Sequence, residues 1–296
     1  MLFALLLVGL MFVLGSTLTR LGVFDDAGAD VLNRFVVYVS LPALVLHVVP
    51  KLHWERELVL LVAVSWGTLL IAALAVLVLA RMLSFPREVL GALLLCAPLG
   101  NTSFLGAPLI AALRGTDALR YAIIYDQLGS FLALSTYALF VIARFSGAKP
   151  PSAGTMLRRV STFPPFVALV VALPLPPLPE ALDAVLGRIG DTLSPLAMFA
   201  AGMRLRLRLP AERSALVSGL GVKMLLVPAC AFMIVRTFGE PGLLADVAIL
   251  EASIPPMLSA AALASMAGLA PELCAALAAY GIVIALGFVP LLAALL

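Results

Sequence analysis

Charged residues are scarce in this chain of 296 residues: they make up 12% of it, whereas 63% of the residues are hydrophobic. Soluble domains carry roughly a quarter charged residues. With so few charged residues, a soluble protein of this composition could not cover its apolar core with polar surface. The composition therefore excludes an ordinary globular enzyme. The net charge of +3 is small, and basic residues in membrane proteins orient loops. We expect no nucleic-acid partner.

Cysteine and histidine are also rare, with 3 and 2 residues. Cys96, Cys230 and Cys274 lie far apart in apolar runs without the spacing of metal ligands, so we interpret them as small packed residues. His47 and His53 fall near the end of a predicted span and in the loop after it, where a surface role is favoured over a ligand role. We find no nucleophile motif or phosphate loop, and we expect neither an enzyme nor a cofactor, apart from a proton or sodium ion as coupling ion.

Long apolar runs are present instead, and they predict an all-α integral membrane protein in a lipid bilayer. A spanning helix needs about 20 apolar residues, and ten spans can be drawn. They cover residues 2–18, 31–49, 58–80, 89–113, 118–143, 163–178, 184–203, 215–238, 243–266 and 273–296. The first run lacks the basic start of a secretory signal and is interpreted as a span. The longest connection, 144–161, is a polar linker between residues 1–143 and 162–296.

The two halves resemble each other at an offset of 153 residues, which places Pro42 on Pro195 and Gly115 on Gly268. This offset aligns spans one to five with spans six to ten. Because five is odd, the second half must enter the membrane from the opposite side. Inverted repeats of this kind are typical of secondary transporters. A chance match between apolar sequences is the alternative.

Basic residues predict the orientation. The side that the loops after odd-numbered spans face holds Arg20, Arg34, Arg81, Arg87, Arg144, Lys149, Arg158, Arg159, Arg204, Arg206, Arg208 and Arg213. The opposite side has Lys51, Arg56, Arg114, Arg120, Arg188 and Arg236. Basic loops favour the cytoplasm, so the linker is predicted to be cytoplasmic and both termini external. Arg204, Arg206 and Arg208 are interpreted as a topology anchor.

Two predicted spans are interrupted at corresponding places. The fourth contains Pro98 and Gly100, and the ninth contains Pro255 and Pro256. Proline and glycine weaken or remove helical hydrogen bonds, and backbone freed at membrane depth must line a cavity or find polar partners. A simple kink would explain one interruption. Two at matching positions of an inverted repeat predict a transport site.

The residues beside the interruptions indicate an anionic ligand. Second half-helices are predicted to begin near residues 102–103 and 256–257, with Thr102 and Ser103 as capping residues and proline at a first helical position. Helix N-termini carry partial positive charge and free N–H groups, which suit a carboxylate. The predicted substrate-binding residues are Asn101, Thr102, Ser103, Pro98, Pro255, Pro256 and Ser259.

The stretch from Gly100 to Leu109 reads GNTSFLGAPL and resembles the GNTGFLGxPL signature of the bacterial auxin efflux carrier family. Residues 32–44 are similar to the second span of that family, and the resemblance covers essentially the full chain. It implies relatives among the plant PIN-type auxin carriers and, more distantly, the bile-acid/sodium symporters. It also implies a scaffold of spans one, two, six and seven beside a transport domain of spans three to five and eight to ten, with spans four and nine crossing.

The resemblance implies roles as well. Asn101 matches the asparagine that contacts the substrate carboxylate in the plant carriers. The resemblance implies a second, symmetric asparagine in span nine, but this chain has Ile254 at that position and departs from the pair. Bacterial members are associated with dicarboxylates such as malate or malonate. The resemblance further implies the bacterial cytoplasmic membrane and a homodimer formed through the scaffold spans.

Three ionisable residues lie inside predicted spans: Asp126, Lys223 and Glu251. Such residues are costly in a membrane and point to function. Glu251 stands just before the second interruption, near the negative end of its half-helix, where a proton or a sodium ion would relieve a bare carboxylate. We assign ion coupling to Glu251, and the further candidates are Asp126, Gln127, Ser253 and Lys223. A hydrogen-bonding role for Asp126 with Gln127 and an ion-paired or snorkelling role for Lys223 remain alternatives.

These observations favour a secondary carrier that moves a small organic anion, auxin-like or dicarboxylate, by an elevator-type alternating-access mechanism. A sodium-coupled symporter of organic anions similar to bile acids is the first alternative. A membrane sensor with a transporter-derived fold is the second, although the sequence contains no inserted soluble signalling domain.

The orientation gives the first testable prediction. A cysteine placed at Ser152, in the linker, should resist a membrane-impermeant thiol reagent in intact cells, because the basic residues hold this loop in the cytoplasm. Labelling before and after permeabilisation measures it. Modification of that cysteine from outside would contradict the orientation.

Overall fold

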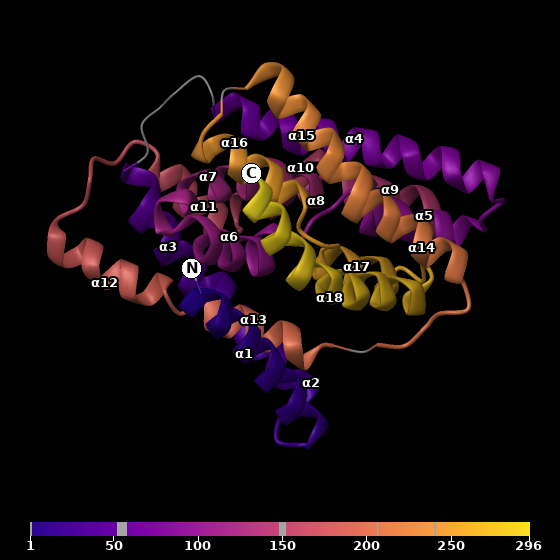
Figure 1. Ribbon diagram of the computed structural model, residues 1–296, viewed down its shortest axis with the longest axis horizontal. Helices are drawn as coiled ribbons and strands as arrows, with labels where there is room; N and C mark the ends of the chain where they lie inside the picture. The colour runs from indigo at the N-terminus through magenta and orange to yellow at the C-terminus, as the bar shows by residue number, and fades with distance from the viewer. Residues whose placement is uncertain (1, 52–57, 148–151, 206, 240) are drawn as a thin grey trace.

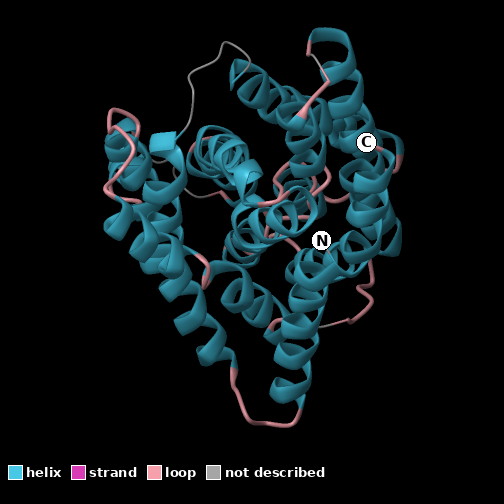
Figure 2. Cartoon of the chain, turned by 60° about the vertical axis from the view of Figure 1, so that its left-hand side comes forward, coloured by secondary structure: helices cyan, strands magenta, loops and turns pink. Residues whose placement is uncertain are grey.

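The computed structural model describes residues 2–51, 58–147, 152–205, 207–239 and 241–296, and all regular elements in these ranges are helical (Figure 1 and Figure 2). The prediction of an all-α protein is confirmed for this part of the chain. Five helices are long and apolar enough to cross a membrane: Ala27–Lys51, Leu58–Met82, Thr116–Ser146, Arg213–Phe238 and Pro271–Leu295. His53, Arg56, Lys149 and Arg206, named above, lie outside the described residues.

The first half contains the helices that the apolar runs predicted, several of them in pieces. Its elements are α1 (Leu2–Arg20), α2 (Asp26–Phe35), η1 (Val36–Ser40), α3 (Leu41–Val48), η2 (Val49–Lys51), α4 (Leu58–Met82), α5 (Arg87–Cys96), η3 (Thr102–Gly106), α6 (Ala107–Arg114), η4 (Thr116–Ala118), α7 (Leu119–Ile124), η5 (Tyr125–Phe131), α8 (Leu132–Ser135) and α9 (Tyr137–Ser146).

The second half begins with a helix in the linker. Its elements are α10 (Ala153–Ser161), α11 (Pro164–Ala172), α12 (Glu180–Gly190), α13 (Leu193–Met203), α14 (Arg213–Gly221), η6 (Val222–Leu226), α15 (Val227–Phe238), α16 (Leu243–Ala252), α17 (Leu258–Met266) and α18 (Pro271–Leu295).

The structure confirms both predicted interruptions, between α5 and η3 and between α16 and α17. It corrects two other expectations. The seventh predicted span is divided at residues 191–192, because Pro195 lacks the N–H that would bond to the carbonyl of Asp191. The sixth ends at Ala172, before the prolines at positions 174, 176 and 177. The polar linker contains the helix α10.

Four wide, π-helical turns interrupt the α-helices. In three of them, η1, η3 and η6, the turn ends two residues before a proline: Pro42, Pro108 and Pro228. A proline cannot donate to the carbonyl four residues back, and the widened turn accommodates that missing bond. Such turns are frequent at functional sites. The fourth turn, η5, contains Asp126 and Gln127.

The helices form two groups that also contact each other, since α1 and α13 of the first group pack on α6 of the second. The first group is α1, α2, α3, α11, α12 and α13: α1 and α2 pack on α13, and α3 packs on α11 and α12. The second group comprises α4 to α9 and α14 to α18, in which α4 contacts α5, α15 and α16. Figure 1 shows α1, α2, α12 and α13 at the left and below, and α4, α5, α14 and α15 at the right.

Two glycines allow the closest crossing in the first group. A methyl group on Gly15 of α1 would lie 2.9 Å from the carbonyl carbon of Phe199, and one on Gly202 of α13 would lie 2.9 Å from that of Phe12. Each helix therefore places its backbone directly on the backbone of the other. Small residues at such crossings are typical of helix pairs in membranes, where close van der Waals packing drives association.

A polar contact joins α3 to α12 within the same group. The side chain of His47 donates to Asp183 at 2.7 Å, and Lys51 donates to the other oxygen of Asp183 at 2.8 Å. The Lys51 ammonium, together with His47, holds the pKa of the Asp183 carboxyl below its ordinary value.

Candidate site at the helix interruptions

The two interrupted segments pair with each other through their backbones. The N–H of Asn101 donates to the carbonyl of Pro255 at 2.9 Å, and the N–H of Met257 donates to the carbonyl of Leu99 at 2.9 Å. Gly100 and Pro256 thus form a single antiparallel bridge. Figure 2 shows loop segments among the helices near the middle of the molecule. Two N–H groups and two carbonyls at the interruptions therefore find their partners on the opposite interruption, as backbone inside a membrane would need.

The first half-helix starts within the expected residues 102–103, and the second starts one residue after the expected 256–257. The first begins at Thr102 with Asn101 at its N-cap position, and the second begins at Leu258 with Met257 there. Neither N-cap side chain makes a capping hydrogen bond. The predicted capping by Thr102 and Ser103 and the predicted proline at a first helical position are wrong. The hydroxyl groups bond elsewhere, and both prolines precede the helix.

The hydroxyl groups instead hold Asp126, on η5. Ser103 donates to its two carboxylate oxygens at 2.7 Å, and Thr102 donates to one of them. The side-chain amide of Gln127 donates to the other oxygen at 2.6 Å. The carboxylate is 4% exposed in this network, and no basic side chain within the described ranges lies within 4.0 Å of it. Asp126 therefore fastens η5 to the first interrupted helix.

A pocket of about 200 Å³ opens beside these residues. Its polar lining consists of Asn101, Ser103, Asp126, Arg159 and Ser259. Its apolar lining consists of Val37, Phe104, Phe131, Leu134, Phe163 and Met257. The side-chain N–H₂ of Asn101 has no hydrogen-bond partner among the described residues although the residue is 1% exposed. A free buried donor and the starts of two half-helices therefore border one mostly apolar space, an arrangement that suits an organic anion.

Sequence reasoning missed two groups of residues in this pocket. Arg159, counted above only as a topology signal, comes from α10 and lines the wall. Partial burial lowers the pKa of its guanidinium, which stays charged at neutral pH. Phe131 and Phe163 stack with their ring centres 4.0 Å apart and form part of the apolar wall. No local signal identifies them, because η5 and the start of α11 meet only in the folded chain.

A second, much smaller cavity lies on the other side of the segment 100–103. It measures about 10 Å³, room for about one water-sized species. Pro98, Gly100, Thr102, Lys223 and Glu251 line it, together with Ser65, Thr68, Leu69, Leu99, Tyr125 and Ser130. Gly100 and Thr102 face this cavity, whereas Asn101 and Ser103 face the larger pocket. One stretch of chain therefore separates two different polar environments.

Glu251 is the least compensated charged residue of the site. It is 0% exposed, and neither carboxylate oxygen has a hydrogen-bond partner in the described part of the chain. Lys223 lines the same cavity and donates to the carbonyl of Ala252 at 3.3 Å, at the negative end of α16. No ion pair within 4.0 Å joins Lys223 to Glu251. The carboxylate packs against Gly106, where a methyl group would lie 3.0 Å from its carboxyl carbon.

The remaining predicted residues have backbone or local roles. The hydroxyl of Ser253 donates to the carbonyl of Ile249 at 2.7 Å inside α16, and Pro255 and Pro256 contribute to the paired backbone. Within the described residues, no group of three His, Cys, Asp or Glu side chains is arranged to hold a metal ion.

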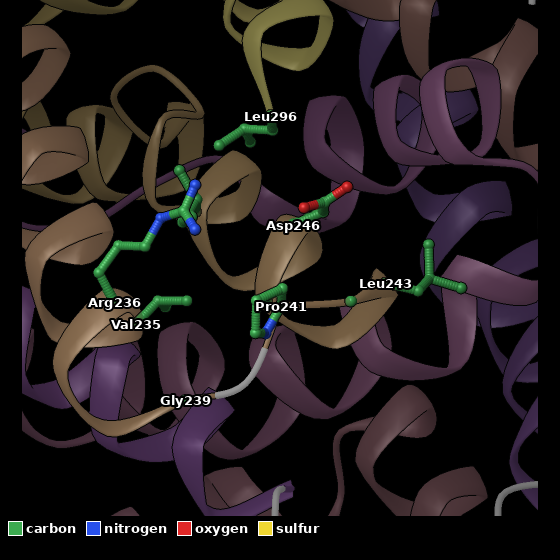
Figure 3. A pocket seen from close by; sticks show the side chains of 10 residues that line it. Val235, Arg236, Gly239, Pro241, Leu243, Asp246 and Leu296 are labelled. Carbon is green, nitrogen blue, oxygen red and sulfur yellow. The ribbon is translucent and has the colours of Figure 1, made fainter.

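A larger cleft, of about 430 Å³, lies at the opposite end of α16 from the interruption (Figure 3). Arg236, Asp246 and Leu296 line it, and none of the predicted site residues does. Asp246 is already paired with Arg114 at 2.8 Å. This cleft lacks the released backbone and the helix starts of the smaller pocket, and we do not assign the site to it.

Comparisons with known proteins agree with a transporter. The model of a family described as membrane transport protein matches residues 1–155 and 152–293. An uncharacterized transporter of Methanothermobacter thermautotrophicus is 30% identical over 260 residues, which cover 85% of this chain and 84% of the relative. An uncharacterized transporter of Methanocaldococcus jannaschii is 26% identical over 268 residues, 84% of each chain.

The packing of Glu251 on Gly106 gives the second prediction. Replacing Gly106 with Ala should lower the free energy of unfolding by about 1–3 kcal/mol, because the added methyl group displaces a buried carboxylate in a filled interior. The matched control is Gly221→Ala, where a methyl group meets no atom within 4 Å and should stabilise the helix slightly. Thermal unfolding of the purified protein in detergent measures both. Equal stability of the two variants would show that Glu251 does not depend on this glycine.

Proposed function

The chain belongs to the membrane transport protein family, the family of the auxin efflux carriers, and from that premise we propose that it is a secondary active carrier for a small organic anion. The single observation that carries this proposal is the pocket where the unpartnered amide of Asn101 meets the starts of η3 and α17. Helix starts and a free amide N–H₂ both stabilise negative charge. The carboxylate of an auxin-like acid or of a dicarboxylate fits this chemistry.

The packing of the helices supports an elevator-type movement. The pocket is lined mainly by the second group of helices, while Val37 of η1 and Phe163 at the start of α11 belong to the first group. In the proposed mechanism the first group, closely joined by Gly15 and Gly202, is the scaffold. The second group carries the interrupted helices and the substrate past it. Residues 1–143 and 162–296 would each contribute to both bodies.

Glu251 is proposed to couple the movement to an ion. A buried carboxylate without hydrogen-bond donors is costly in its charged form, so its burial is favoured when a proton or a cation accompanies it. The small cavity lies directly behind the segment that borders the substrate pocket. A change of charge at Glu251 is therefore transmitted to Asn101 and Ser103 through a stretch of only a few residues.

A sodium-coupled symporter is the second candidate. The oxygen atoms of Glu251, Ser65, Thr68, Thr102 and Ser130 line one cavity, and oxygen is the ligand that hard cations prefer. The ammonium group of Lys223 in the same cavity opposes a second cation there. This favours a proton over sodium as the coupling ion.

The third prediction concerns the substrate. Replacing Asn101 with Ala should weaken binding of the transported carboxylate about ten- to hundredfold, because a hydrogen bond to a charged group contributes about 1.5–3 kcal/mol. Uptake by proteoliposomes as a function of carboxylate concentration measures it. The control is Ser253→Ala, which removes a buried hydroxyl next to the other interruption that bonds only within its own helix. Unchanged half-saturation in Asn101→Ala would remove Asn101 from the site.

The fourth prediction concerns coupling. Glu251→Gln should transport the same carboxylate with little dependence on an imposed proton gradient, because glutamine cannot bind and release a proton. Proteoliposomes under separate pH and sodium gradients distinguish the two coupling ions. If the wild type responds to sodium alone, the symporter alternative is correct. If Glu251→Gln keeps the dependence of the wild type, Glu251 is structural and Asp126 becomes the candidate.

A further inference from the structure

Arg159 is an arginine of the pocket wall without an acidic partner. Two other arginines lie beside carboxylates: Arg114 pairs with Asp246, and Arg204 pairs with Asp30. Within the described ranges no Asp or Glu oxygen lies within 4.0 Å of the Arg159 guanidinium. Its neighbour Arg158 is exposed, whereas Arg159 is partly buried against the pocket.

The local structure fixes where Arg159 points. Helix α10 begins with Ser152, whose hydroxyl accepts from the N–H of Thr155 at 3.2 Å, and it packs on α8 and α11. At its other end the hydroxyl of Thr162 donates to the carbonyl of Arg158 at 2.8 Å. Phe163 follows immediately, stacked on Phe131. Arg159 and Phe163 therefore enter the pocket from one anchored turn of chain.

The charges of the pocket require a cation when an anion binds. Asp126 is the acidic residue of the lining, and its hydrogen bonds come from the neutral groups of Thr102, Ser103 and Gln127. A substrate carboxylate next to Asp126 would place two negative charges in a mostly apolar space, where repulsion is weakly screened. The guanidinium is the unpaired positive group in the same lining, and it presents several N–H donors in a fork that matches a carboxylate.

We propose that Arg159, contributed by the linker between the two halves, binds the anionic group of the substrate together with Asn101. This inference rests on the proposed function and adds a binding residue outside the interrupted helices. Because α10 runs directly into α11 of the proposed scaffold, we assign Arg159 to the scaffold, so the contact of α10 with α8 must change when the transport body moves. The contact therefore exists in one of the two access states and holds the anion on the side of the membrane that α10 faces.

The experiment measures binding of benzoate and of malonate to the purified full chain by isothermal titration calorimetry, with neutral benzamide as the uncharged comparison. Arg159→Gln should weaken binding of the anion that the wild type binds about ten- to hundredfold, since a charge-assisted hydrogen bond is lost. Binding of benzamide should not change. Arg159→Lys should recover part of the loss, and the matched control Arg158→Gln should bind as the wild type does.

The outcomes separate the two proposals. If the wild type binds an anion and Arg159→Gln binds it equally well, Arg159 is not a substrate residue and the proposed function stands. If the wild type binds neither anion, the proposed function fails and this inference fails with it. If Arg159→Gln unfolds at a lower temperature, the folded Arg159→Lys variant decides: weaker binding of the anion than in the wild type supports the contact with the forked guanidinium, and wild-type affinity contradicts it.

In transport, the state dependence gives a second readout. With protein inserted in one orientation, Arg159→Gln should raise the half-saturating concentration of the transported carboxylate on the side of α10 more than on the other side. Equal changes on both sides would contradict a contact confined to one access state.

Discussion

The structure depends on two backbone hydrogen bonds, Asn101 to Pro255 and Met257 to Leu99. Prolines and a glycine interrupt two helices, and each interruption supplies backbone partners to the other. Inside a membrane, unpaired N–H and carbonyl groups would be very costly. The pairing brings two helix starts and the end of α16 to one place. The concentration of positive helix starts on one side, and of Glu251 and Lys223 on the other, follows from it.

The pairing also explains why two different chemical environments lie so close together. Over residues 100–103, where the chain passes from the backbone bridge into η3, Asn101 and Ser103 line the pocket of about 200 Å³, and Gly100 and Thr102 line the small cavity. Thr102 and Ser103 both bond to Asp126, which links the two sides. A carrier requires that the ion and the substrate influence each other. Here the shortest path between their proposed sites is one turn of chain.

Much of the fold can be predicted from the sequence. Apolar runs of about 20 residues predict helices, and the interruptions are predicted by Pro98, Gly100, Pro255 and Pro256. The division at residues 191–192 was readable too, from Pro195, and so were the π-helical turns before Pro42, Pro108 and Pro228. The caps were mispredicted since Thr102 and Ser103 bond to Asp126, a partner 23 or more residues away. The role of Arg159 could not be predicted for the same reason, because its partners in the pocket are distant in the sequence. A basic residue near a predicted span indicates topology, and only the packing of α10 brings Arg159 to the pocket.

The central claim is that the anion binds where the two interrupted helices meet. A crystal of the protein grown with 4-bromobenzoate tests it most directly, because anomalous scattering locates the bromine without reference to any other part of the structure. We expect a bromine in the pocket between Phe131, Phe163 and Met257, with the carboxylate toward Asn101. A bromine in the cleft beside Arg236 and Asp246, with the pocket at the interruptions free of it, would contradict anion binding at the interruptions.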